Sequence, residues 1–188
     1  MGPEREILER VAADGEDRDR PLASPLAYDV WLHDIRGGHN VGSVMRIVDA
    51  MGLGAVHRSG FTPGPDVAAV RAAAMGCETW IPNHAHATAR DFLLWLENER
   101  ATATRAGRPT PALIGLETTP DAATLGDFDW PRAGVLLVGN EELGIEPESL
   151  RHCDHVIRIP LYGRKASMNL ATAFAIVAHD LRTRADRR

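Results

Sequence analysis

Two segments, Gly134–Ile145 and Arg158–Asn169, restrict the fold of this chain more than any other part of its sequence. In the first, the apolar run Val135–Val138 ends in a glycine-rich acidic turn. In the second, a short apolar run is followed by a Ser-Met-Asn turn that opens a helix. Strands that end in polar turns bring those turns to one edge of a parallel sheet, where open α/β proteins bind ligands. The two segments therefore predict an α/β fold with a ligand site at that edge.

Strand and helix patterns alternate along most of the chain. The expected strands cover residues 28–33, 55–59, 78–81, 111–116, 135–138 and 156–159. Apolar residues at helical spacing predict helices at 40–51, 66–75, 88–106, 147–152 and 169–184. Asn40, Asp66 and Asn169 are expected to cap three of these helices. The alternation is typical of a mainly parallel, six-stranded sheet with helices on both faces.

The bulk properties suit one globular domain. A chain of 188 residues buries about 70% of its unfolded surface, and we expect an N-terminal extension at 1–27 before a single domain at 28–188. No apolar run approaches the ~20 residues of a membrane span, and the first residues lack the features of a secretory signal. Cys77 and Cys153 provide no disulfide framework, so a cytoplasmic location without membrane attachment is expected.

Charge is distributed unevenly along the chain. The net charge is −5, but residues 1–30 contain four Arg against eight Asp and Glu, whereas residues 151–188 contain seven Arg and one Lys against three Asp. The basic C-terminal portion is compatible with phosphate binding. Only Lys165 among the 21 basic residues is a lysine, so the arginine content equally fits a bias in genome composition.

The first candidate motif is His39–Arg46, at the start of a predicted helix. Asn40 suits the N-cap position, which by itself would explain its presence. Arg46 lies about a turn and a half further along. Two interpretations stay open: a solvated helical arginine, or an arginine that Asn40 orients toward a phosphate or a developing oxyanion.

The second and third candidate motifs are Gly139–Gly144 and Ser167–Asn169. Glycine-rich turns let backbone approach a ligand closely, but they also end many parallel strands. Ser and Asn before an apolar helix are good caps, so the third motif has a purely structural interpretation as well. Its upstream residues Gly163, Arg164 and Lys165 make a cationic loop suited to RNA phosphates.

Taken in order, the three motifs resemble the SpoU/TrmH family of the SPOUT superfamily, which are AdoMet-dependent RNA ribose 2′-O-methyltransferases. The resemblance covers about residues 28–182, and the ordered triple match is highly specific. It rests on Asn40-x5-Arg46, on Leu137–Ile145, and on Ile159-Pro-Leu followed by Ser167–Leu170. It implies a SPOUT-type fold with a deep C-terminal trefoil knot, and homodimers whose active sites are completed across the interface. Asn140, where many members carry Pro or Ser, and the second acid Glu142 depart from the family pattern.

The resemblance also assigns roles to residues. Arg46 is expected to stabilise the forming 2′-alkoxide electrostatically, because a guanidinium loses its proton only above pH ~12 and makes a poor base. Asn40 and Glu141 are expected to hold Arg46 and the neighbouring loop, and Ser167 and Asn169 to position the third motif around cofactor and ribose. The residues expected to bind AdoMet are Leu116, Gly139, Gly144, Ile159, Leu161, Ser167, Met168 and Leu170. Those expected to bind RNA, either tRNA or rRNA, are Arg36, Arg46, Arg164 and Lys165.

Other functions remain as alternatives. One is a non-catalytic AdoMet- and RNA-binding protein of the same fold, against which the presence of both Asn40 and Arg46 argues. Another is an unrelated nucleotide-binding α/β enzyme such as a dehydrogenase, which the missing G-x-G-x-x-G after the first strand disfavours. Metal-ligand residue types occur at Cys77, His84 and His86 and at His152–His155, but without a standard zinc spacing, so no metal is expected.

Overall fold

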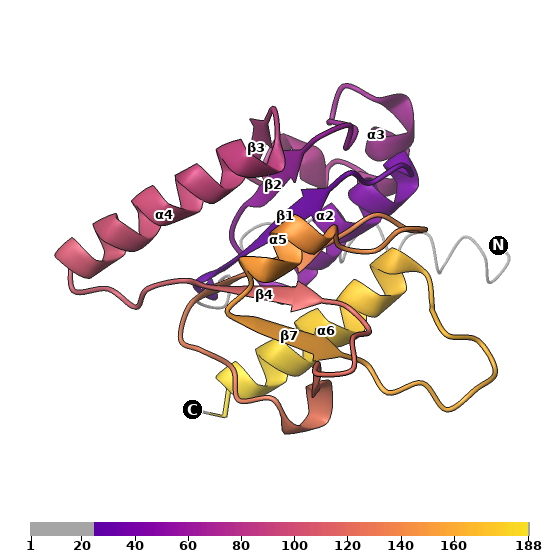
Figure 1. The fold of residues 1–188 in the computed structure, drawn as a ribbon. Helices are drawn as coiled ribbons and strands as arrows, with labels where there is room; N and C mark the ends of the chain where they lie inside the picture. The colour runs from indigo at the N-terminus through magenta and orange to yellow at the C-terminus, as the bar shows by residue number, and fades with distance from the viewer. Residues whose placement is uncertain (1–24, 188) are drawn as a thin grey trace, which may run out of the picture.

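The structure is a computed structural model that describes residues 25–187, and its centre is one sheet of seven parallel strands (Figure 1). The strands lie in the order β3-β2-β1-β6-β4-β7-β5, and every pairing between neighbours is parallel. They are β1 (Tyr28–His33), β2 (Val56–Ser59), β3 (Asn83–His86), β4 (Ala112–Leu116), β5 (Ala123–Thr124), β6 (Gly134–Val138) and β7 (His155–Arg158). The predicted α/β fold with a mainly parallel sheet is confirmed.

Helices cover both faces of the sheet, as the alternation predicted (Figure 1). Apolar residues of α2 (Gly38–Met51), α3 (Ala68–Ala74) and α6 (Leu170–Ala185) share one core with one face of the central strands. The other face packs against α4 (Ala89–Arg105) and α5 (Pro147–Arg151) in a second core. Two short 3₁₀ helices, η1 (Cys77–Thr79) and η2 (Leu125–Asp127), lie in the connections. Alternation along the strands separates the two cores, because successive side chains of a strand point to opposite faces.

Two predictions about strands were wrong. The expected strand at 78–81 is not formed, because residues 77–79 make η1 and the edge strand β3 begins at Asn83. The side chains of β3 are polar or small and none is fully buried, so no hydrophobic pattern marks it. The two-residue strand β5 was missed as well, which raises the count from six strands to seven.

Two of the three predicted caps were also wrong. Helix α2 begins at Gly38 after Gly37, so Asn40 lies within the first turn and its side chain is free for other contacts. Helix α3 begins at Ala68 after Val67, not after Asp66. Asn169 does cap α6, since its side-chain Oδ1 accepts a hydrogen bond from Thr172 N at 3.1 Å.

The central strands β1, β6, β4 and β7 are neighbours in the sheet, so their carboxyl ends lie at one edge. The second motif follows β6 and the third follows β7, while the first motif follows β1. Of the N-terminal extension expected at 1–27, residues 1–24 lie outside the described part of the chain. Within residues 25–187, no helix combines the length and the apolar character that crossing a membrane requires.

Candidate active site

A cavity of about 500 Å³ opens at the carboxyl ends of β4, β6 and β7. All eight residues expected to bind a cofactor line it, although their role in binding stays a prediction. The wall residues are Asn40, Leu116, Glu117, Thr118, Val138, Gly139, Asn140, Glu141, Glu142, Gly144, Arg158, Ile159, Leu161, Ala166, Ser167, Met168, Asn169, Leu170 and Ala173. The volume falls in the range of small-molecule sites, roughly 300–1,000 Å³.

One residue from each of the three motifs meets the others at this cavity. The side-chain amide of Asn40 donates to Glu141 Oε1 at 2.8 Å, and Asn169 Nδ2 donates to Asn40 Oδ1 at 3.0 Å. Residues separated by more than a hundred positions are thereby joined in one polar chain. Because Asn40 does not cap its helix, both ends of its amide are used in this junction.

Glu141 also binds the start of α2 through backbone groups. Its carboxylate accepts hydrogen bonds from Arg36 N and Gly37 N, both at 2.9 Å. Partial burial pushes the pKa of Glu141 upward, but the hydrogen bonds from Arg36 N, Asn40 and Gly37 N outweigh it and hold the pKa below its usual range. Glu141 therefore acts as an ionised cap that ties the β6 turn to α2.

The turn after β6 is closed by its own backbone. Asn140 and Gly144 exchange two backbone hydrogen bonds of 3.0 and 2.9 Å. Gly144 has φ +71°, a left-handed conformation that favours glycine. A Cβ on Gly139 would lie 2.4 Å from the carbonyl oxygen of Gly144, so the turn requires a glycine there too. These contacts give the two glycines a structural reason that holds whether or not a ligand is bound.

Two side chains for which the sequence predicted no role, Asn140 and Glu117, form hydrogen bonds that stabilise the same turn. Asn140 accepts from Glu142 N and Leu143 N at 2.9 and 3.0 Å and donates to Asp34 O at 2.7 Å. Glu117, at the end of β4, accepts from Ile145 N at 2.8 Å. Sequence reasoning missed Glu117, because nothing near it in sequence signals a contact with a turn 28 positions away.

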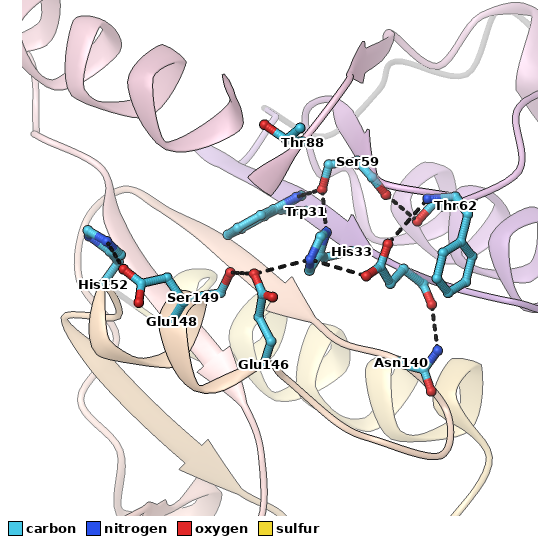
Figure 2. A network of polar contacts seen from close by, with 12 residues as sticks. Trp31, His33, Ser59, Thr62, Thr88, Asn140, Glu146, Glu148, Ser149 and His152 are labelled. Carbon is cyan, nitrogen blue, oxygen red and sulfur yellow. Dashed lines mark hydrogen bonds and ion pairs between the residues drawn. The ribbon is translucent and has the colours of Figure 1, made fainter. Parts of the chain in front are cut away.

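Beside the turn, a polar network links β1, β2 and the start of α5 (Figure 2). The hydroxyl of Ser59 accepts from Trp31 Nε1 at 2.7 Å and lies 2.7 Å from His33 Nδ1. The other ring nitrogen of His33 lies 3.3 Å from Glu146, which also accepts from the Ser149 hydroxyl at 2.8 Å. Buried polar groups are thus satisfied by one another at the edge of the sheet that carries the cavity.

Arg46 does not belong to the cavity wall of its own chain. It is exposed on α2, and its Nη1 contacts the sulfur of Met75 at 3.2 Å. Met75 is exposed by 70% of its surface, and Trp80, which donates a hydrogen bond to Asp49 of the same helix α2, by 58%. The structure therefore joins Asn40, Glu141 and Asn169 but leaves Arg46 apart from them.

The residues expected to bind RNA have different surroundings. Arg36 forms an ion pair with Glu142 at 2.6 Å on the rim of the cavity. Arg164 and Lys165 are exposed in the loop between β7 and α6, and the structure gives them no ion pair within residues 25–187. The same loop contributes Leu161, Ala166 and Met168 to the cavity wall.

The histidines considered as metal ligands contact other side chains in pairs. His57 Nδ1 and His86 Nε2 face each other at 3.0 Å, and the His57 ring packs against His84. His152 lies 3.6 Å from Glu148, and His155 packs on Phe128. Across residues 25–187, no group of three or more His, Cys, Asp or Glu side chains has an arrangement that could hold a metal ion.

Comparison with characterised proteins points to relatives over most of the chain. The tRNA (guanosine(18)-2′-O)-methyltransferase of Escherichia coli K12 is 26% identical over 151 residues, 80% of this chain and 61% of that protein. The 23S rRNA (uridine(2479)-2′-O)-methyltransferase of Streptomyces viridochromogenes is 29% identical over 176 residues, 93% of this chain and 59% of that protein. The chain thus spans about three fifths of the length of these relatives.

Solved structures share the fold. The SpoU methyltransferase AviRb from Streptomyces viridochromogenes superposes with a TM-score of 0.76 at 25% identity, over 90% of this chain and 64% of that one. An AdoMet-bound rRNA methyltransferase from Sinorhizobium meliloti gives a TM-score of 0.72 at 26% identity, over 94% of this chain and 70% of that one. The family model for the SpoU rRNA Methylase family matches residues 28–179. Because this match covers most of the 188 residues, the chain belongs to the SpoU rRNA Methylase family.

Proposed function

We propose that this chain is an AdoMet-dependent methyltransferase that modifies a ribose 2′-hydroxyl of tRNA or rRNA. The observation that carries the proposal is the junction of Asn40, Glu141 and Asn169, one from each motif, at the mouth of the cavity. Relatives named as tRNA and rRNA 2′-O-methyltransferases match most of the chain and support the same activity.

The chemistry of the cavity suits AdoMet. Leu161, Met168 and Leu170 supply apolar walls for an adenine ring, and the loop ends at Gly139 and Ile159 present backbone groups that can hydrogen-bond its edge. When bound, AdoMet supplies a methyl group made electrophilic by the sulfonium. The protein's task is then to hold the nucleophile in line with that methyl and to exclude water.

Arg46 has the role of electrostatic stabiliser, and it acts on the cavity of a second copy of the chain. In its own chain Arg46 is exposed on α2 away from the cavity wall, in contact with the exposed Met75, while the exposed Trp80 contacts Asp49 on the same helix. A homodimer that covers this surface would bury apolar area and bring the guanidinium to a neighbouring cavity. The proposal therefore requires a dimer.

The guanidinium of Arg46 then stabilises the negative charge that develops on the 2′-oxygen. A phosphate oxygen of the RNA substrate would accept the hydroxyl proton, and AdoMet would supply the methyl group, its sulfur keeping the electrons of the carbon–sulfur bond. Asn169 fixes the third-motif loop, since it caps α6 with its Oδ1 and contacts Asn40 with its Nδ2. Ser167 lines the cavity beside it and orients the ribose.

RNA is held by the basic residues around the opening. Arg164 and Lys165 contact phosphates, and Arg36, already paired with Glu142, contributes at the rim. We further propose that the segment after β7 forms the trefoil knot of the SPOUT fold. We also propose that the protein acts in the cytoplasm, where its cysteines Cys77 and Cys153 remain free thiols.

Transfer of a labelled methyl group from AdoMet to fractionated tRNA and rRNA, followed by mapping of the modified nucleotide, tests the function. We expect label at a ribose 2′-oxygen, and much less with Arg46→Lys, which keeps the charge but loses the planar fork. Failure to label any cellular RNA would favour a non-catalytic binding protein. Near-normal turnover by Arg46→Lys would contradict the role of Arg46.

A further inference from the structure

Within residues 25–187, Arg158 is the one basic residue that lines the cavity. It ends β7 and is partly buried there, with its backbone paired to Thr124 of β5. Neither the three motifs nor their expected functions account for an arginine at this position.

The carboxylates of the cavity wall already have partners. Glu117 accepts from the backbone nitrogens of Ile145 and Thr118, both at 2.8 Å. Glu141 is bound by the start of α2, and Glu142 is paired with Arg36 at 2.6 Å. Arg158 differs, because no side chain or backbone oxygen in the described part of the chain forms an ion pair or a hydrogen bond with its guanidinium. A guanidinium without a partner, on a partly buried residue of the cavity wall, is available to an anion bound in that cavity.

We propose that Arg158 binds the α-carboxylate of the methionine moiety of AdoMet, an assignment that rests on the proposed function. The carboxylate is the single anionic group of that molecule, whose other charges are the sulfonium and the ammonium cations. Three glutamates make the rest of the wall acidic, which attracts the cations and repels the carboxylate everywhere except near Arg158. The charges of the wall therefore fix the direction in which the amino-acid end of the cofactor lies.

A phosphate of the RNA is the rival anion. Arg164 and Lys165 lie exposed in the loop that follows, where an RNA backbone can reach them without entering the cavity. Arg158 is partly buried at a strand end and lines the cavity itself, so a ligand inside the cavity is its nearer partner. Burial and position favour the cofactor over the RNA.

Calorimetric titration of AdoMet and of decarboxylated AdoMet into the 188-residue protein tests the assignment. Wild-type protein is expected to bind AdoMet about 10- to 100-fold more tightly than decarboxylated AdoMet, which is the range for a hydrogen-bonded charge pair. Arg158→Gln should lose that factor for AdoMet and leave the affinity for decarboxylated AdoMet unchanged. Arg158→Lys should retain part of it. Arg105→Gln, at the exposed end of α4, is the matched control and should bind both ligands as wild type does.

The outcomes separate the two proposals. Suppose that wild type binds AdoMet and that Arg158→Gln binds each of the two ligands with the affinity of wild type. The assignment of Arg158 is then wrong, while the proposed function stands. If Arg158→Gln raises the KM for RNA without changing the affinity for AdoMet, the arginine serves the RNA phosphate, and the assignment is again wrong. If wild type itself binds no AdoMet, both proposals fall. Thermal unfolding of the variants checks that they are folded.

Discussion

The side-chain amide of Asn40 lies 2.8 Å from the carboxylate of Glu141, and this contact joins the first turn of α2 to the turn after β6. The same carboxylate accepts two backbone N–H groups at the start of α2. One ionised side chain thus holds together two of the three segments from which the cavity is built. Its protonation state should be visible in the stability of the whole domain.

Glu141→Gln should remove part of the pH dependence of stability. The pKa of Glu141 is lower in the folded protein than its ordinary value near 4.5, so its contribution is complete above that value and is lost as pH falls through the folded pKa. We expect the difference in the free energy of unfolding between wild type and Glu141→Gln to be largest near pH 6 and to shrink toward pH 3. Urea unfolding at a series of pH values measures it. Glu97→Gln, an exposed glutamate on α4, is the control, and equal pH profiles for all three proteins would contradict the prediction.

Gly139→Ala should destabilise the β6 turn. The added Cβ would meet Gly144 O and Ile145 N at 2.4 and 2.5 Å, backbone atoms that have little freedom to move. Overpacking of this kind costs about 1–3 kcal/mol, and we also expect weaker binding of AdoMet. Gly126→Ala is a matched control, because its Cβ would meet no atom within 4 Å. Calorimetry gives the melting temperatures of both variants. An unchanged melting temperature for Gly139→Ala would show that the backbone of the turn can shift to accommodate the added Cβ.

Ser59→Ala should destabilise the network beside the cavity. Ser59 is 1% exposed, and without its hydroxyl the indole N–H of Trp31 and one ring nitrogen of His33 lose a partner. An unsatisfied buried polar group costs about 1–3 kcal/mol. Guanidinium chloride unfolding should therefore show a free energy of unfolding lower by at least about 1 kcal/mol. Ser43→Ala on α2 removes a hydroxyl that has no hydrogen bond within residues 25–187, and it should be neutral or slightly stabilising. A Ser59→Ala protein as stable as wild type would mean that the two nitrogens find other acceptors.

Mixed dimers should reveal whether Arg46 serves a neighbouring chain. Arg46→Ala and Asn169→Ala are each expected to lower methyl transfer strongly, by a factor on the order of 10²–10³ for a lost stabiliser. When the two proteins are unfolded together and refolded, half of the dimers are mixed, and each mixed dimer has one intact site. Activity should return to about a quarter of wild type if sites are shared between copies. Activity that stays at the level of the separate variants would assign Arg46 to its own chain.

The sequence allowed the location of the cavity to be predicted because the carboxyl ends of the strands determine it. Residues such as Gly139 and Ser167 follow apolar runs, and parallel strands bring their carboxyl ends to one edge. The wrong prediction for Asn40 arose because a cap and an internal first-turn residue have the same local sequence. What distinguishes the two is the carboxylate of Glu141, a hundred residues away.

Other features had no local signal at all. The edge strand β3 has no apolar alternation, since its four residues are Asn, His, Ala and His and none of them is fully buried. The roles of Glu117 and Ser59 depend on partners that only the folded chain brings within reach. An arginine such as Arg158 can be recognised as unpaired only when every neighbouring carboxylate has been located.

The carboxylate of Glu141 has one further consequence. Arg46 lies on α2, and α2 is anchored at its start to the same turn that forms one wall of the cavity. Any molecule that binds in the cavity and restricts the motion of this turn would also restrict the motion of α2, which carries the guanidinium of Arg46 on the outer surface. Under the proposed role of Arg46, occupancy of the cavity would therefore also affect how firmly the guanidinium is held on the outer surface.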